Sequence, residues 1–299
     1  MSIVVLGTLA LDTLKTPAGR KEDILGGSAA HFSMAARLFT KVNLVAIIGE
    51  DFPQRHIDFL KNKGIILTSL IKGKGKTFRW EGEYKGDLNT AITLNTELGV
   101  LSAFRPTLTE VQRYIKYLFL ANVDPDIQYH LLEHMHAPKL VGLDSMNFWI
   151  KNKRHSLVKL LKKVDIYLAN EHEARELSGR YNLIEAAKFL RKLGPEMIVI
   201  KKGEHGVLFY SDNFIFSLPG YPVNKVIDPT GAGDTFAGGL MGYLAKADKL
   251  NSRVLRKAIA YAVTIASFNV EKFGLERSAN LDISEVNQRV KKLKNIIHF

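Results

Sequence analysis

The chain has 299 residues, of which 46% are hydrophobic; it carries a formal net charge of +12 and contains no cysteine. This length fits one large α/β domain, and the lack of cysteine excludes disulfide bonds and cysteine-based zinc or nucleophile chemistry. No apolar run reaches the length of a membrane span, and residues 1–7 lack the basic start and the cleavage site of a secretion signal. We therefore expect a cytoplasmic enzyme with no membrane partner.

The positive charge has two interpretations. It can attract anionic ligands such as nucleoside triphosphates, or nucleic acid. The basic residues are spread along the chain, however, and the densest cluster, at 289–294, has no aromatic neighbours on which bases could stack. We therefore predict a lysine-rich surface and no nucleic-acid partner.

Short β-branched runs alternate with helical patterns along the chain, which is typical of a mainly parallel sheet covered by helices. We expect strands at 3–6, 44–48, 117–121, 140–143, 166–169 and 197–201, and a late hairpin at 207–210 and 214–217. Helices are expected at 28–38, 53–63, 109–116, 125–136, 153–163, 171–178, 183–193, 231–246, 252–269 and 283–295.

Residues 77–98 interrupt this alternation. Phe78, Trp80 and Tyr84 alternate with charged residues, which predicts a strand with one apolar face. A turn at 86–87 leads into a return strand on which apolar residues alternate again. Such a hairpin could cover a site as a flap, pair with the same flap of a second subunit, or be an ordinary edge hairpin of the main sheet.

Segment 228–239 is the most informative part of the chain. A turn at Asp228 leads into Gly231, Ala232 and Gly233, and a helix follows, so backbone N–H groups converge at the positive end of a helix dipole. This predicts an anion site, although no Walker A or dinucleotide motif is present. A purely structural turn could use the same glycines but would not require the adjacent Asp234. An anion site with a base beside it indicates phosphoryl transfer to a hydroxyl group.

Two further features are weaker when taken singly. Gly26 and Gly27 precede the helix at 28–38, where they allow close packing against the sheet or a ligand. Asp12 follows the first strand and is therefore expected at the sheet edge where ligands bind in open α/β folds. A carboxylate there could accept hydrogen bonds from sugar hydroxyls, or it could cap a loop.

Together these segments resemble the ribokinase family, also called the PfkB carbohydrate kinase family. Segment 228–239 resembles its C-terminal motif, 26–37 its N-terminal motif, and Asn-Glu-His-Glu at 170–173 its N-x-x-E motif. The resemblance implies a single ribokinase-like three-layer α/β domain over 1–299. It also implies a small β-sheet lid built from about 13–24 and 77–98, which in some members clasps a second subunit into a homodimer.

The resemblance further implies roles for individual residues. Asp234 would be the catalytic base, and Gly231, Ala232 and Gly233 would form the anion hole. The phosphate acceptor is expected to contact Asp12, Gly26, Gly27, His31 and Trp80. ATP is expected beside Asn170, Lys201, Gly203 and Gly206.

The same resemblance implies metal sites. Glu173 would organise Mg²⁺, largely through water, and Asp228 matches a position that in several members helps to bind a monovalent cation such as K⁺. Asn170 has a purely structural alternative, since it ends a strand and can cap the helix that carries Glu173.

Two departures bear on the substrate. His31 stands where ribokinase itself commonly has asparagine, which makes ribose a less secure acceptor, and Lys201 replaces a frequent threonine beside the nucleotide. The first hypothesis is an ATP-dependent sugar kinase. The alternatives are a nucleoside kinase of the same family, favoured by the aromatic lid, and a non-catalytic sugar- or nucleotide-binding protein.

Overall fold

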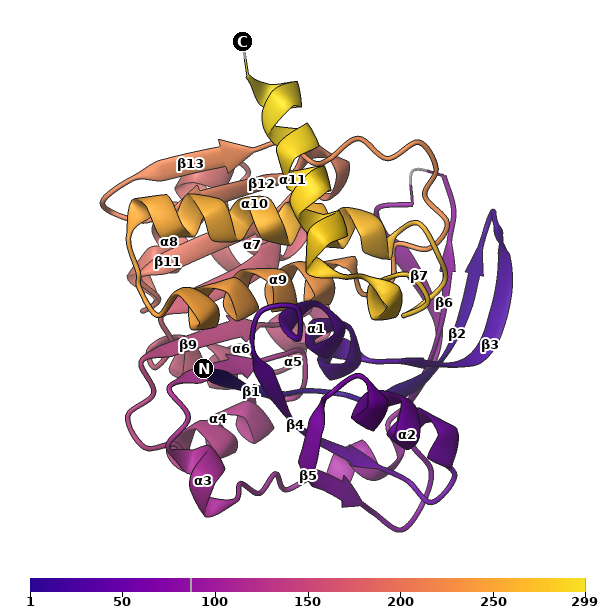
Figure 1. Ribbon diagram of the computed structural model, residues 1–299. Helices are drawn as coiled ribbons and strands as arrows, with labels where there is room; N and C mark the ends of the chain where they lie inside the picture. Colours follow the sequence, from indigo (N-terminus) through magenta and orange to yellow (C-terminus); the bar gives the residue numbers. More distant parts are fainter. Residues whose placement is uncertain (87, 299) are drawn as a thin grey trace.

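The computed structural model describes residues 1–86 and 88–298, and its centre is a nine-stranded sheet (Figure 1). The strand order is β13-β12-β11-β10-β9-β8-β1-β4-β5. The strands are β1 Ser2–Leu6, β4 Lys41–Ile48, β5 Ile66–Lys72, β8 Tyr117–Leu120, β9 Leu140–Asp144, β10 Ile166–Asn170, β11 Met197–Lys201, β12 Val207–Tyr210 and β13 Ile215–Leu218. The run from β11 to β5 is parallel, and β12 and β13 form an antiparallel edge.

This sheet confirms the predicted parallel architecture and the late hairpin. Strand β5 was not predicted; it pairs only with β4 and is largely half-buried. An edge strand of this kind carries polar residues such as Thr68 and Ser69 within its apolar run, so its hydrophobic pattern is weak.

Helices cover both faces of the sheet. One face carries α1 Ser28–Ala36, α2 Gln54–Asn62, α9 Ala232–Ala247, α10 Ser252–Asn269 and α11 Ile283–Ile297. The other carries α3 Glu110–Arg113, α4 Pro125–Glu133, α5 Asn147–Asn152, α6 Arg154–Leu161, α7 Glu171–Ser178 and α8 Leu183–Lys192. Short 3₁₀ turns lie at Gly99–Ala103, Gly203–His205 and Ser278–Asn280. Helix α5 was not predicted, and α3 is shorter than the expected 109–116.

Strand β1 shows why its sequence is continuously apolar. Ile3 and Val5 belong to the core under α9 and α10, whereas Val4 and Leu6 belong to the core on the opposite face. All four side chains have no exposed surface. Complete burial of such a side chain stabilises the fold by roughly 1.5–3 kcal/mol, so a strand covered on both sides gains from every position.

A second, four-stranded sheet stands beside the main body in the order β3-β2-β6-β7 (Figure 1). Its strands are β2 Ala10–Thr16, β3 Gly19–Gly26, β6 Arg79–Tyr84 and β7 Ala91–Glu97. We call this sheet the lid. It joins the two segments that were expected to form one, and the hairpin of β6 and β7 is therefore not an edge of the main sheet. Asp87, half of the predicted turn, lies outside the described residues.

The strand pairing of the lid hairpin is irregular. The register of β6 with β7 shifts between Glu81 and Gly82, so that Leu94 of β7 is an extra residue without a partner on β6. Strand β6 itself stays in regular register with β2, and the Trp80 indole folds over Gly82, where a Cβ would lie 2.1 Å from the ring. Glu83 is buried, with its carboxylate 2.9 Å from the ammonium groups of both Lys15 and Lys85. The β-bulge therefore lies on β7, a feature that the sequence did not predict.

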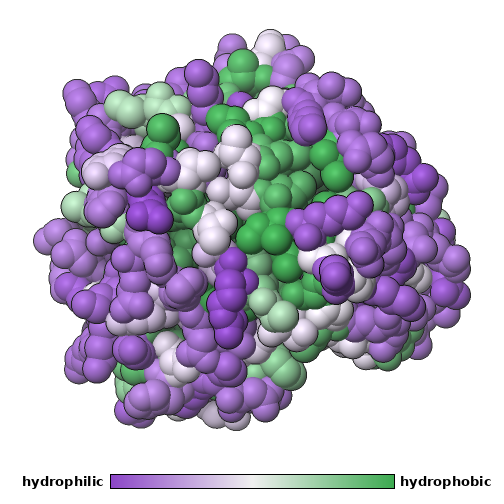
Figure 2. All heavy atoms as spheres, turned by 90° about the horizontal axis from the view of Figure 1, so that it is seen from below, coloured by the Kyte–Doolittle hydropathy of each residue, from purple (hydrophilic) through white to green (hydrophobic). Residues whose placement is uncertain are grey.

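Within the described residues, no helix is both long and apolar enough to cross a membrane. The face in Figure 2 is largely hydrophilic, with apolar residues gathered in a band across its middle. This distribution agrees with the charged, lysine-rich surface predicted from the composition.

Candidate active site

Helix α9 begins at a sharp left-handed turn. Gly231 has φ 70°, and a Cβ there would lie 2.2 Å from the His31 ring, so both backbone and space require glycine. Ala232 donates its N–H to the Pro229 carbonyl at 3.1 Å, whereas the N–H groups of Gly231 and Gly233 have no backbone partner in the described chain. The helix start therefore leaves donors free at its positive end, as an anion site requires.

Asp234 lies in the first turn of α9, directly after these donors. Its burial, with a contribution from Asp144 and against the effect of Lys201, raises its pKa to about 7. A general base works best when its pKa lies near the operating pH. Asp234 therefore lies where a base could act on a group held by these donors, and its role as the catalytic base stays a prediction.

His31 lies beneath the anion site, in a polar network centred on Asn269. The Asn269 amide nitrogen donates to the Thr230 carbonyl at 2.8 Å, which leaves its oxygen facing Nδ1 of His31 at 3.2 Å and the Thr235 hydroxyl at 3.1 Å. His31 therefore donates through Nδ1. Burial lowers its pKa, so the ring is neutral and Nε2 is an acceptor; Nε2 is buried without a partner among the described residues.

This network ties three parts of the chain to one another: α1, the turn before α9, and the end of α10. His31 is only 2% exposed and packs against Gly231, so it lies against the anion loop. Its predicted contact with the acceptor stays a prediction. Asn269 was not predicted, because a single polar residue near the end of a helix has no local signature.

Asp12 lies in β2 at the base of the lid. A Cβ on Gly26 would come within 1.9 Å of its carboxylate, and one on Gly27 would meet the Thr8 carbonyl at 2.4 Å. Both paired glycines are thus needed for close approach. Burial and the nearby Asp228 raise the pKa of Asp12 to about 8. At neutral pH Asp12 is therefore protonated. Its carboxyl group can both donate and accept a hydrogen bond with the molecule that receives the phosphate.

Asp228 is completely buried beside this group. Its two oxygens accept backbone N–H groups of Thr230 at 2.9 Å and Gly274 at 2.8 Å. These bonds hold the turn that leads into α9. A monovalent cation at Asp228 stays a prediction.

Lys201, Asn170 and Asp144 end three neighbouring parallel strands, β11, β10 and β9. The Lys201 ammonium lies 2.6 Å from the Asp144 carboxylate, and both side chains are largely buried. The negative charges of Asp144 and Glu173 outweigh the effect of burial and raise the pKa of Lys201. Asp144 was missed, although it follows a predicted strand just as Asp12 does.

Asn170 and Glu173 form a reciprocal cap at the start of α7. The Asn170 side chain accepts the Glu173 N–H at 2.8 Å, and the Glu173 carboxylate accepts the Asn170 N–H at 2.7 Å. Burial, together with Asp144, raises the pKa of Glu173 to about 8. The structural role considered for Asn170 is thus confirmed, and its contact with ATP stays a prediction.

The donor set fits a water-rich Mg²⁺ site rather than a cage of side chains. No group of three or more carboxylate or imidazole side chains that could hold a metal occurs in the described parts of the chain. One oxygen of Glu173 is used by the cap, which leaves the other for a metal-bound water. Mg²⁺ characteristically keeps several waters and binds through one or two carboxylates and substrate phosphates.

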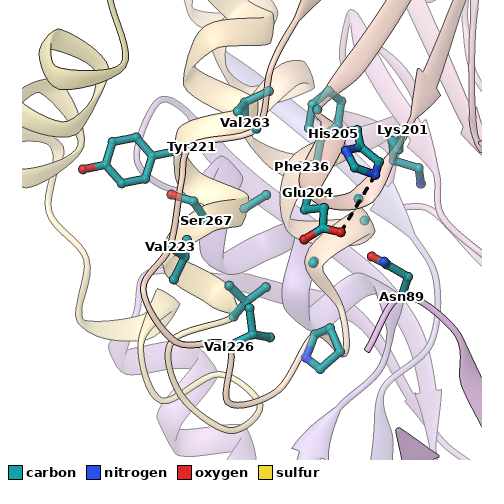
Figure 3. A pocket seen from close by; sticks show the side chains of 18 of the residues that line it. Asn89, Lys201, Glu204, His205, Tyr221, Val223, Val226, Phe236, Val263 and Ser267 are labelled. Carbon is teal, nitrogen blue, oxygen red and sulfur yellow. Dashed lines mark ion pairs between the residues drawn. The ribbon is translucent and has the colours of Figure 1, made fainter. Parts of the chain in front are cut away.

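A cavity of about 730 Å³ opens directly beside the anion site. It is lined by Lys201, Ala232 and Gly233 at one end and by apolar side chains farther along. Figure 3 shows Val223, Val226 and Ser267 across from Glu204 and His205. Its volume falls within the range of small-molecule and cofactor sites.

The predicted glycines of this cavity lie in left-handed backbone that other residues rarely adopt. Gly203 and Gly206 have φ 55° and 86°, and a Cβ on Gly206 would lie 2.0 Å from the Leu218 carbonyl oxygen. Asn89, from the loop between β6 and β7, packs against Gly203. The lid therefore contributes to two places: its β6–β7 loop borders the cavity through Asn89, and its strand β2 carries Asp12.

Two lid aromatics have different surroundings. Trp80 pairs in register with Asp12 in the parallel strands β6 and β2, which places both side chains on one face of the lid. Its indole N–H donates to the Thr93 hydroxyl at 3.2 Å. Tyr84 is buried, and its hydroxyl accepts from Thr230 at 3.4 Å, so it ties the lid to the turn before α9.

Comparison with known proteins agrees with this geometry. The model of the pfkB family carbohydrate kinases matches residues 8–281. The chain belongs to this family. It is accordingly a kinase with an alcohol group as acceptor, in the class of sugar and nucleoside kinases, as the resemblance implied. Kinases of this family use ATP together with Mg²⁺.

Similar proteins include both nucleoside and sugar kinases. The chain is 31% identical to the cytidine kinase of Thermococcus kodakarensis, over 81% of this chain and 88% of that one. The nucleoside kinase of Methanocaldococcus jannaschii has the same fold, with a TM-score of 0.78, 21% identity and coverage of 97% and 98%. A ribokinase of Arabidopsis thaliana complexed with ribose and ATP superposes with a TM-score of 0.79, 20% identity and coverage of 97% and 98%.

Proposed function

We propose that this protein is an ATP-dependent nucleoside kinase, which transfers the γ-phosphoryl group to a hydroxyl of the nucleoside sugar. The observation that carries the reaction is the position of Asp234, a carboxyl group with a pKa of about 7 that directly follows the free N–H donors at the start of α9. A base at an anion site suits proton removal from a hydroxyl that attacks a phosphate.

Two observations favour a nucleoside over a bare sugar, which reverses the order in which the sequence ranked them. The similarity to a cytidine kinase extends over 81% of the chain. Trp80 presents an aromatic ring on the same face of the lid as Asp12. We therefore infer that Asp12 binds the sugar and that Trp80 contacts the base.

In this mechanism the chain supplies alignment and charge. Asp12 orients the acceptor hydroxyl toward Asp234, which takes its proton. The N–H groups of Gly231 and Gly233 stabilise the charge that develops on the phosphate. Glu173 would hold Mg²⁺ through water, and the ion would supply positive charge to the phosphates. The lid excludes water, which would otherwise accept the phosphoryl group.

The test is to measure phosphorylation by the purified protein, with ATP and Mg²⁺, of two nucleosides and two free sugars. Cytidine and adenosine are each compared with ribose, and fructose is tested as a second sugar. We expect kcat/KM to be at least tenfold higher for one nucleoside than for ribose. A higher value for ribose or fructose would restore the sugar kinase hypothesis. If sugars bind but no acceptor is phosphorylated by ATP, the result supports the hypothesis of a non-catalytic binding protein.

We further propose that the lid pairs with that of a second copy. Ile92 and Leu94 on its return strand and Leu98 directly after that strand are 46%, 52% and 43% exposed, which is unusual for large apolar side chains at a sheet edge. Sedimentation analysis of the wild type and of Ile92→Lys tests this. We expect a dimer for the wild type and a monomer for the variant; a monomeric wild type at micromolar concentration would refute it.

A further inference from the structure

A single lysine faces three carboxyl groups at the phosphate end of the site. The Lys201 ammonium lies 2.6 Å from the Asp144 carboxylate, with side chains 16% and 5% exposed. The same ammonium lies only 3.1 Å from the point that a Cβ on Gly233 would occupy. Lys201 therefore lies next to the N–H donors of the anion site. Gly233, which it borders, is the residue directly before Asp234.

The charge balance of this region requires a cation. Asp144, Glu173 and Asp234 all act electrostatically on Lys201. Lys201 is the only lysine or arginine among the described residues that line the 730 Å³ cavity. Without it, a polyphosphate entering this end would face the buried Asp144 carboxylate with no lysine or arginine of the described cavity lining beside it, and like charges repel most strongly where water is excluded.

Two roles for Lys201 are compatible with the ion pair alone. In the first, the lysine only neutralises Asp144, and the pair is a structural element of the sheet edge. In the second, the ammonium binds the phosphate and Asp144 sets its place. The distance to Gly233 favours the second, because a lysine that served only Asp144 has no need to border the anion site. Lysine is a common phosphate ligand as a compact point charge.

We propose that Lys201 is a catalytic residue that contacts the transferring phosphate, and that Asp144 is a positioning residue that holds its ammonium beside Gly233. This inference rests on the proposed function for the identity of the anion. It adds to the backbone anion hole a charged side chain, and it assigns a purpose to a carboxylate that would otherwise oppose phosphate binding.

The first experiment compares single variants. Lys201→Met removes the charge at similar size, and we expect both kcat and the affinity for a non-hydrolysable ATP analogue to fall roughly 10- to 100-fold, the usual range for a hydrogen bond to a charged group. Asp144→Asn keeps the ammonium but frees it, so kcat should fall about tenfold while the KM for ATP changes less than twofold. Lys202→Met is the matched control and should resemble the wild type, since Lys202 does not line the cavity.

The decisive variant is Lys201→Met combined with Asp144→Asn. If Lys201 only neutralises Asp144, the uncharged pair should recover wild-type kcat and ATP affinity to within threefold, and the proposal is overturned. If the ammonium contacts phosphate, the double variant stays at least tenfold impaired. Melting temperatures show whether each variant folds, and the double variant avoids the unpaired buried carboxylate that can destabilise the single one.

Calorimetric binding of the ATP analogue and of AMP separates this inference from the proposed function. Lys201→Met should weaken the triphosphate analogue and leave AMP unchanged, whichever acceptor the enzyme uses. A wild type that binds the analogue but phosphorylates no acceptor refutes the kinase function and leaves Lys201 testable. Equal losses for the analogue and AMP, or a wild type that binds neither, would overturn the role of Lys201.

Discussion

The start of α9 and the lid differ in how firmly they are held. Around α9, His31, Asn269 and Asp228 are almost wholly buried, and each is bonded to a different part of the chain. The lid is a four-stranded sheet with an exposed return strand, and its charged side chains pair mostly at the surface. Surface pairs of this kind contribute little to stability.

This contrast indicates a division of labour. In the proposed mechanism the reaction depends on donors and a base that must not shift by much, and these lie in the densely bonded part. In the same proposal the acceptor contacts the lid, whose surface ion pairs contribute little to stability. Such a protein can change its substrate without disturbing its chemistry, which is consistent with relatives that act on cytidine and on ribose.

The largest effect is expected from Asp234→Asn, which keeps the shape of the base and removes its proton affinity. We expect kcat to fall by roughly 10²–10⁴-fold, with ATP affinity nearly unchanged, because the backbone donors remain. Single-turnover kinetics and calorimetry measure the two. The wild-type kcat should also rise with pH up to a plateau above about 7, since the base must be unprotonated. Near-normal turnover in the variant would remove Asp234 from the mechanism.

The next effect concerns the glycine that His31 packs against. Gly231→Ala places a methyl group 2.2 Å from the imidazole in backbone with φ 70°. Gly179→Ala is the matched control, because Gly179 has φ 67° and nothing within 4 Å. The control should lose about 1 kcal/mol in the free energy of unfolding from backbone strain alone.

Gly231→Ala should lose an additional 1–3 kcal/mol or so from the steric overlap, and kcat/KM for ATP should fall at least about tenfold. Chemical denaturation and steady-state kinetics give both quantities. If the two alanine variants match in stability and in kinetics, the His31 network does not hold the anion site.

Much of the rigid part was predictable from sequence because its signals are local. A left-handed turn favours glycine, and an anion site requires free N–H groups at the start of a helix. Both features lie within 228–239. The parallel strands were likewise identified from continuous apolar runs. Asn269 acts on a distant segment, 238 positions from His31, and no local pattern marks such a partner, whereas Asp144 does follow a predicted strand.

The lid was predictable only in outline. Alternating residues indicated two strands, but the bulge at Leu94 of β7 has no sequence signal of its own. The parallel pairing of β2 with β6 joins segments about seventy residues apart. Register of this kind is decided by tertiary contacts.

A smaller effect is expected on the pH dependence of stability, through Asp12 at the base of the lid. Asp12 has a pKa of about 8 in the folded protein against 3.8 as an ordinary carboxyl, so folding takes up a proton between these values. The free energy of unfolding therefore falls as pH rises through that window. Asp12→Asn does not titrate, and it should be about 1–3 kcal/mol more stable than the wild type at pH 8, with a smaller difference at pH 5. Urea denaturation at both pH values tests this; a difference independent of pH would contradict it.

The smallest effect should come from the exposed strand of the lid. Leu94 is 52% exposed, so Leu94→Ser should change the free energy of unfolding by no more than about 0.5 kcal/mol in the monomer and leave kcat unaltered. Measured at low and high protein concentration, this variant also probes the proposed pairing of lids. A partner that covers Leu94 stabilises the folded state by mass action, so the loss should then grow with concentration. A large loss at low concentration would mean that the lid is as tightly held as the start of α9.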